Sequence, residues 1–177
     1  MAIIKIQGTE ETITEQKEVA EFLQQQEVIY ENWDISKLSE NLREKFDLSD
    51  AEKEEILETF KGEIADISER RGYKAADVIS LSDSNPKLDE LLKNFQRKHL
   101  HTDDEVRYIV SGHGVFIIKA TDGRFFEVHL DPGDLISVPE NTVHYFTLAD
   151  DRKVVAVRLF ITQEGWVPVY QDGETNA

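Results

Sequence analysis

Four side chains in two short stretches of the sequence have the types and the spacing of a metal site. His99, His101 and Glu105 lie close together, and His144 follows after a further interval. The chain has no cysteine, so a metal ion can be held only by nitrogen and oxygen ligands. Three imidazoles and one carboxylate suit iron(II), nickel(II), cobalt(II), manganese(II) or zinc(II), and do not resemble the all-oxygen cage of calcium or magnesium. These residues therefore predict one transition-metal ion.

The spacing within the first stretch indicates how the ligands could converge. Side chains alternate between the two faces of an extended segment, so His99, His101 and Glu105 share a face unless a loop near Asp103 breaks the alternation. His144 must come from another strand. In octahedral geometry four protein ligands leave two coordination positions open, enough for a bidentate enediol. Zinc more often has only four ligands in total. The alternative is that each histidine separately caps a strand or pairs with a surface carboxylate; the clustering favours an open, catalytic metal site.

Other polar residues near these clusters have simpler explanations. His113 lies between two glycines in an expected hairpin turn, and His129 lies on an expected edge strand. We assign both histidines to structure. Asp103 and Asp104 are adjacent carboxylates in an expected loop, where such groups are more often solvated than bound to metal.

The elements that must position these residues change in character near residue 98. After it, short β-branched and aromatic runs alternate with glycine and proline, which is typical of strands and turns. Expected strands cover residues 107–110, 115–119, 124–130, 135–138 and 154–160, and expected turns cover 112–114, 121–123, 131–133 and 149–151. Strands this close together, without helical crossovers, predict antiparallel pairing. An antiparallel sandwich or barrel follows.

Residues 10–98 instead show the periodicity of helices and loops. The first helix is expected from residue 14, the second from 49 to 72 and the third from 86 to 95, each with an apolar stripe that predicts core packing. A capping box, Ser49 with Glu52 three residues later, marks the start of the second helix.

Length and composition limit the class of protein. A chain of 177 residues is about one domain long, so we expect residues 1–177 to form a single domain, with a helical part (1–98) packed on core strands (99–170) and a polar tail (171–177). The net charge of -16 disfavours nucleic acid and anionic membranes as partners. The sequence lacks an apolar stretch long enough to span a membrane and lacks a secretory signal at its start. We expect a cytoplasmic protein.

At the candidate ligands the sequence resembles the two motifs of the cupin superfamily. The first motif is matched by His99, His101, Glu105 and Gly112. The second is matched by Gly133, Pro139 and His144, with Asn141 where many cupins have glycine. Asparagine tolerates a left-handed backbone better than other non-glycine residues, so this departure is mild. The resemblance implies a mostly β fold with N-terminal helices, namely the antiparallel double-stranded β-helix barrel, or jelly roll.

Within that superfamily the chain resembles the acireductone dioxygenases over nearly its whole length. The segments that carry this resemblance are residues 30–33, 107–114, 135–146 and 165–170. The family's usual His-Trp-Phe after the last ligand reads His144-Tyr145-Phe146 here, which leaves the ligands untouched but changes packing at the mouth of the barrel.

The resemblance implies a substrate, a cofactor and a pocket. The substrate is the acireductone of the methionine salvage pathway, cleaved with dioxygen at one iron(II) or nickel(II) ion per chain. With iron(II) such enzymes give the keto acid precursor of methionine and formate; with nickel(II) they give methylthiopropionate, formate and carbon monoxide. The resemblance also places Phe95, Arg107, Phe146 and Trp166 in the substrate pocket, with Arg107 as a catalytic residue. Phe95 and Phe146 equally suit a core position, and Trp166 also suits a plug of the barrel.

The same ligand set leaves other functions open. Oxalate-type decarboxylases and other dioxygenases of the cupin superfamily use three histidines and one glutamate, and product analysis distinguishes them. A non-catalytic cupin that only binds a small molecule would contain less than stoichiometric metal. A zinc isomerase would contain zinc and consume no oxygen. For an acireductone dioxygenase we expect a monomer whose partners are acireductone and O2.

Overall fold

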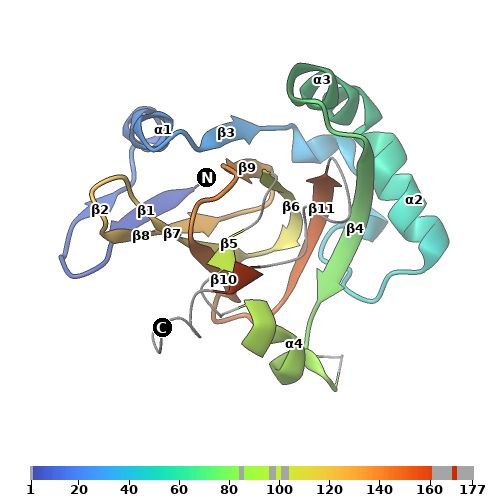
Figure 1. Cartoon of the computed structure of the whole chain (residues 1–177). Helices are drawn as coiled ribbons and strands as arrows, with labels where there is room; N and C mark the ends of the chain where they lie inside the picture. The colour runs from blue at the N-terminus through green and yellow to red at the C-terminus, as the bar shows by residue number, and fades with distance from the viewer. Residues whose placement is uncertain (1, 84–85, 96–98, 101–103, 161–168, 171–177) are drawn as a thin grey trace.

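Two antiparallel sheets face each other in the computed structural model, which describes residues 2–83, 86–95, 99–100, 104–160 and 169–170 (Figure 1). The seven-stranded sheet contains, in spatial order, β12 (Val169–Tyr170), β5 (His99–Leu100), β10 (His144–Leu148), β7 (Gly114–Lys119), β8 (Phe125–Leu130), β1 (Ile3–Ile6) and β2 (Thr12–Ile13). The five-stranded sheet contains β3 (Ile29–Asn32), β9 (Asp134–Val138), β6 (Glu105–Gly112), β11 (Val154–Phe160) and β4 (Ala75–Leu81). This arrangement confirms the predicted antiparallel, mostly β barrel with helices from the N-terminal part.

The inner faces of the two sheets share one apolar core. It contains alternate residues of the strands, among them Ile4, Phe116, Phe146, Ile109 and Ala156. Helices α1 (Gln16–Gln25) and α4 (Leu88–Phe95) add the buried residues Val19, Leu23, Leu88 and Leu92 to this core. Leu91 departs from the expected stripe, because its side chain is 37% exposed. Each of the two helices therefore packs one apolar face against the core between the sheets.

A second apolar layer lies between the outer face of the five-stranded sheet and helices α2 (Asp50–Thr59) and α3 (Lys61–Arg71), which lie beside β4 in Figure 1. The predicted start and end of this helical region are confirmed by the capping box at Ser49 and the left-handed Gly72 (φ 81°). The expectation of one continuous helix from residue 49 to 72 was wrong, because Phe60 (φ -106°, ψ 15°) separates α2 from α3. Phe60 is fully buried against Trp33 and Tyr108, and Gly62, a poor helix former, lies two residues later.

The N-terminal half also contributes strands, so its description as helix and loop alone was wrong. β1 pairs with β8, β3 with β9 and β4 with β11. These short segments lie along strands of the barrel that would otherwise expose unpaired backbone N–H and C=O groups. Pairing of this kind depends on tertiary context more than on local propensity. The short 3-10 turns at Ile35–Lys37 and Glu40–Leu42 complete this half.

Of the four expected turns, residues 121–123 form the hairpin between β7 and β8. At residues 112–114, 131–133 and 149–151 the chain instead crosses from one sheet to the other. Consecutive strands then face each other across the barrel, because they belong to different sheets. Side chains that are far apart in the sequence can therefore meet inside it.

The crossing at Gly112 requires the absence of a side chain. Its φ is +71°, and a Cβ there would lie 2.1 Å from the carbonyl oxygen of Lys153. We expect Gly112→Ala to destabilise the protein by about 3 kcal/mol, from left-handed strain and a displaced backbone together. Gly123→Ala is the matched control, since Gly123 (φ +91°) has nothing within 4 Å and should show only the strain of about 1–2 kcal/mol. Urea denaturation measures both; equal losses would contradict the steric argument.

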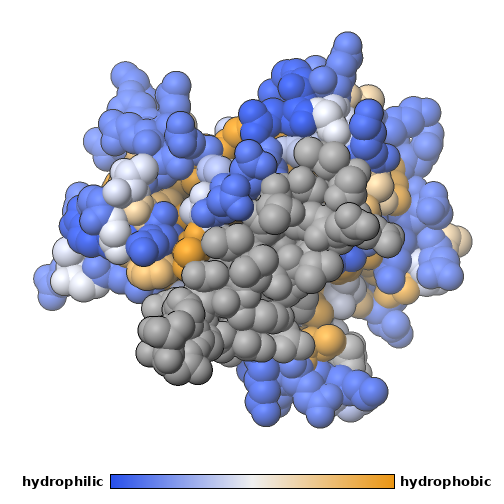
Figure 2. Space-filling view, in the orientation of Figure 1, coloured by the Kyte–Doolittle hydropathy of each residue, from blue (hydrophilic) through white to orange (hydrophobic). Residues whose placement is uncertain are grey.

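The surface of the helical elements is hydrophilic. Figure 2 shows hydrophilic residues over the helices at the periphery of the molecule, with apolar residues visible between them, in keeping with the net charge of -16. Among the described residues, no helix is both long and apolar enough to cross a bilayer.

Candidate metal centre

Glu105 and His144 meet inside the barrel, although they come from opposite sheets. Glu105 is the first residue of β6 and His144 the first residue of β10. Their side chains are 4–5% and 1% exposed, and His144 Nε2 contacts Glu105 Oε2 directly. A buried carboxylate is costly unless an opposite charge or a metal ion compensates it. The two residues thus form a buried, preformed pair of candidate ligands.

The position of the imidazole proton of His144 follows from a neighbouring backbone group. His144 Nδ1 lies 2.8 Å from the carbonyl oxygen of Thr142, which can only accept, so Nδ1 donates its proton there. In neutral His144 the Nε2 lone pair then faces the Glu105 carboxylate. Two acceptors that face each other are stable only with a shared cation, either a proton or a divalent metal ion. Backbone carbonyls commonly orient metal-binding histidines in this way, so this donor set fits a metal ion.

The other two expected ligands are described only in part or not at all. The backbone of His99 in β5 pairs directly with that of His144 in β10. His101 lies outside the described residues, and within the part of the chain that is described no three histidine, aspartate or glutamate side chains form a metal-binding group. From the sequence we expected His99 and Glu105 to converge because they would share one face of an extended segment. That explanation was wrong, because β5 and β6 belong to different sheets. Glu105 instead reaches His144 across the barrel.

Arg107 lies on the same face of β6 as Glu105 and is 2% exposed. Its Nη2 donates to Glu105 Oε1 at 3.1 Å, so the carboxylate lies between the guanidinium and His144. Burial lowers the pKa of Arg107 to about 10, while the charge of Glu105 opposes that shift. Arg107 therefore remains a cation near neutral pH, although it is inaccessible to bulk water.

Aromatic side chains line the barrel next to His144. The ring of Phe116 lies 6.1 Å from that of His144 and 5.0 Å from that of Phe146. Phe146 is 3% exposed and belongs to the inner core, which is compatible with both interpretations made from the sequence. A Cβ on Gly114 would lie 2.7 Å from Phe146 Cε2, so this glycine leaves space for the ring. The side chain of Phe95 and all of Trp166 lie outside the described residues.

The turn before His144 depends on Asn141, which has φ 61°. This conformation explains why asparagine can replace the glycine of the cupin motif. We expect Asn141→Gly to retain or slightly increase stability, whereas Asn141→Val should cost about 1–2 kcal/mol or more from left-handed strain. The valine variant should also bind metal more weakly, because the next residue carries the carbonyl that orients His144. Thermal unfolding and metal titration measure the two effects. If valine matched glycine in both, the turn would not depend on this conformation.

Asp104 connects the candidate site to its surroundings, and the expectation that it is solvated was wrong. Its side chain is 12% exposed, and it accepts hydrogen bonds from Arg71 Nη2 at 2.6 Å, Tyr73 Oη at 3.0 Å and the Glu140 backbone N–H at 3.2 Å. Through these hydrogen bonds, Asp104 connects the end of α3 and the turn before His144 to the start of β6. The role of the Thr142 carbonyl could not be predicted from the sequence, since a backbone acceptor has no residue signature. Asp103 lies outside the described residues.

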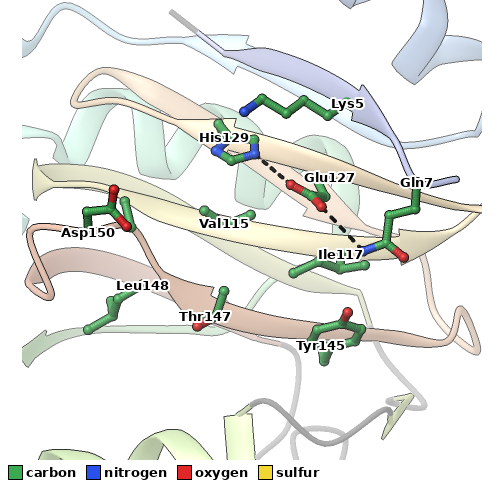
Figure 3. Close-up of a pocket in the computed structure, with 11 residues that line it drawn as sticks. Lys5, Gln7, Val115, Ile117, Glu127, His129, Tyr145, Thr147, Leu148 and Asp150 are labelled. Carbon is green, nitrogen blue, oxygen red and sulfur yellow. Dashed lines mark hydrogen bonds and ion pairs between the residues drawn. The ribbon is translucent and has the colours of Figure 1, made fainter. Parts of the chain in front are cut away.

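The two remaining histidines contact carboxylates away from this site. His113 lies in a crossing between sheets, not in the expected hairpin, and its Nδ1 and Nε2 lie 2.7 Å and 3.4 Å from Asp151 and Asp131. His129 lies on β8, which is flanked by β7 and β1, so the expectation that His129 lies on an edge strand was wrong. Its Nε2 contacts Glu127 Oε1 at 2.8 Å beside a surface hollow of about 470 Å³ (Figure 3). This partly exposed pair contrasts with the buried pair of Glu105 and His144.

Comparison with known proteins gives one consistent family. The model of the ARD/ARD′ family matches residues 3–168. The chain is 67% identical over 177 residues to the acireductone dioxygenases of Bacillus licheniformis and Bacillus subtilis, covering 99% of the chain and of each relative. The solved acireductone dioxygenase from Bacillus anthracis, with a cadmium ion in its active center, has 62% identity and a TM-score of 0.95, over 96% of this chain and 98% of that one.

Proposed function

This chain belongs to the ARD/ARD′ family, and from that membership we propose that it cleaves acireductone with dioxygen at a metal ion held by His99, His101, Glu105 and His144. The observation that carries the proposal is the buried contact of His144 Nε2 with Glu105 Oε2, two groups that need a shared cation. The similarity to acireductone dioxygenases extends over nearly the full chain, which supports the substrate as well as the fold.

We propose iron(II) or nickel(II) as the ion, one per chain. The donor set suits a borderline divalent transition metal, and the cadmium ion of the Bacillus anthracis relative is a divalent ion in the same kind of centre. A metal ion held by these residues would supply a Lewis acid to which the enediolate form of acireductone can bind for its reaction with O2. The proposed products are those of the family: the keto acid precursor of methionine and formate with iron(II), and methylthiopropionate, formate and carbon monoxide with nickel(II).

The residues of the chain would bind and orient the substrate around that ion. Arg107 already lies beside Glu105, so its guanidinium is placed to donate to an oxygen of the bound enediolate. Phe146 and Phe116 exclude water from the side of the barrel next to His144. The pocket roles of Phe95 and Trp166 rest on the family resemblance. The carbonyl of Thr142 keeps the His144 proton on Nδ1, which leaves Nε2 available as a ligand.

The decisive experiment is anaerobic reconstitution with iron(II), nickel(II), manganese(II) or zinc(II), followed by oxygen uptake and product identification with acireductone. Oxygen uptake with iron and nickel, and with different products for each, is the expected result. Decarboxylation of oxalate with manganese, or isomerase activity with zinc and no oxygen uptake, would assign the site to another cupin activity. Failure to retain stoichiometric metal would favour a non-catalytic binding module.

We further propose that the chain forms a single domain that acts as a monomer in the cytoplasm. The layer of apolar side chains between α2, α3 and the five-stranded sheet supports a single folding unit. The absence of cysteine is compatible with a reducing compartment. Sedimentation equilibrium of the metal-loaded protein tests the oligomeric state.

A further inference from the structure

Three charged residues form a row across neighbouring strands of the five-stranded sheet. Arg107 of β6 pairs directly with Arg158 of β11, and Arg158 pairs directly with Asp77 of β4. The three strands lie side by side in Figure 1. Directly paired residues of an antiparallel sheet project to the same face, and Arg107 projects into the barrel toward Glu105. The row therefore lies on the inner face of the sheet, where Ala156 of β11 joins the inner core.

Exposure increases along this row from the candidate metal centre toward solvent. The side chain of Arg107 is 2% exposed, that of Arg158 28% and that of Asp77 40%. Arg158 Nε donates to Asp77 Oδ1 at 2.7 Å, and its Nη2 contacts Asp77 Oδ2. The pair of Arg158 and Asp77 is thus the more exposed end of a row of charged residues whose buried end, Arg107, contacts Glu105.

Two guanidinium groups on directly paired residues repel each other. Like charges on paired positions are destabilising unless a counter-ion compensates them. Asp77 compensates Arg158 in this structure. An anion that enters from solvent would meet first Arg158 and then Arg107 on the inner face of the five-stranded sheet.

We propose that Arg158 binds the substrate anion at the mouth of the barrel, so that the enediolate exchanges with Asp77 there before it reaches Arg107. This inference rests on the proposed function for the identity of the anion. The local attraction of Arg158 and Arg107 opposes the negative field of a chain with net charge -16, which otherwise repels an anionic substrate. Arg158 acts as a substrate-binding residue and takes no part in metal binding.

The test compares Arg158→Gln with wild type at equal metal content. We expect about a tenfold higher KM for acireductone and a kcat within about twofold, because the variant loses one charge-assisted contact during entry. The dependence of kcat/KM on salt should also become weaker, since screening acts on the charge that has been removed. Arg158→Lys should keep most of the salt dependence, because it keeps the charge.

Two further variants separate substrate binding from a structural role. Asp77→Asn breaks the same ion pair but leaves Arg158 charged, so its KM should stay the same or fall. Arg152→Gln changes net charge equally at an exposed residue that pairs with Asp83 and Asp89, and it should leave KM unchanged. If Asp77→Asn raises KM as Arg158→Gln does, or if Arg158→Gln lowers kcat with KM unchanged, the pair only holds two strands together and the proposal is wrong.

An independent probe distinguishes failure of this inference from failure of the proposed function. Ascorbate is a stable enediol that is anionic at neutral pH, and its binding to the nickel-loaded protein can be measured anaerobically by calorimetry. We expect Arg158→Gln to weaken ascorbate binding about tenfold and Asp77→Asn not to weaken it. Equal ascorbate affinities for wild type and Arg158→Gln overturn the inference, whereas an inactive wild type that still shows this difference overturns only the choice of acireductone as substrate.

Discussion

Glu105→Ala should lose the metal ion and should also be less stable than wild type before any metal is added. Among the described residues, His144 contacts this carboxylate through Oε2 and Arg107 contacts it through Oε1. Removal of the carboxylate leaves the guanidinium of Arg107, 2% exposed, without its acidic neighbour. Loss of one partner from a buried ion pair typically costs about 3–5 kcal/mol. Urea denaturation of metal-free protein measures this loss, and metal analysis after dialysis measures retention.

Replacement of the imidazole ligands should separate the two effects. His144→Ala, like His99→Ala and His101→Ala, should weaken metal retention, but His144→Ala removes no charge that Arg107 requires. Its apo form should therefore lose less stability than that of Glu105→Ala. Stoichiometric metal in all four variants would remove the basis for the proposed metal site.

The partly exposed pair of Glu127 and His129 provides the matched control. Its carboxylate and imidazole lie 2.8 Å apart, but the side chains are 29% and 32% exposed on the other face of the seven-stranded sheet. Surface pairs of this kind contribute roughly 0–1 kcal/mol. Glu127→Ala should therefore keep both the metal and most of the stability. An equal loss of stability in Glu127→Ala and Glu105→Ala would mean that burial of Arg107 does not determine the effect.

The fold could be predicted from the sequence where local pattern and tertiary structure agree. The β-branched runs after residue 98 became β6, β7, β8, β9 and β11. Four of these strands, β6, β7, β9 and β11, are largely buried on both faces and therefore need nearly continuous apolar sequence, whereas β8 alternates between buried and half-buried residues. The segment Ala75–Leu81 carries no comparable signal, and it is a strand because it pairs along β11. The break at Phe60 likewise arises from burial against Trp33 and Tyr108, which no local pattern contains.

The candidate site could be predicted in its residue types but not in its geometry. The motif spacing named Glu105 and His144 as candidate ligands, and the structure brings their side chains into contact. The family resemblance named Arg107 as a pocket residue, and the structure places it beside Glu105. Convergence across two sheets was not predictable, because it depends on crossings that looked like hairpin turns. The carbonyl of Thr142 and the bridging role of Asp104 depend on backbone positions, which the sequence does not encode residue by residue.

Arg107→Ala should retain metal but lose about two or more orders of magnitude in turnover. The proposed role of Arg107 is to stabilise negative charge on the enediolate, and removal of one such preorganised donor typically costs roughly 100- to 1000-fold in kcat. Arg107→Lys should recover little, because a single ammonium group on a flexible stem cannot reproduce a planar fork of donors. Oxygen uptake at saturating acireductone, normalised to bound metal, measures each variant.

Retention of metal in Arg107→Ala follows from the position of Glu105 between Arg107 and His144. Without the guanidinium, the buried carboxylate loses one compensating cation, so its need for the cation shared with His144 should increase. The apo variant should therefore be less stable than wild type, and metal should restore more of its stability than it adds to wild type. Normal turnover in Arg107→Ala, or loss of activity only in proportion to lost metal, would instead show that Arg107 serves to neutralise Glu105 and has no direct role toward the substrate.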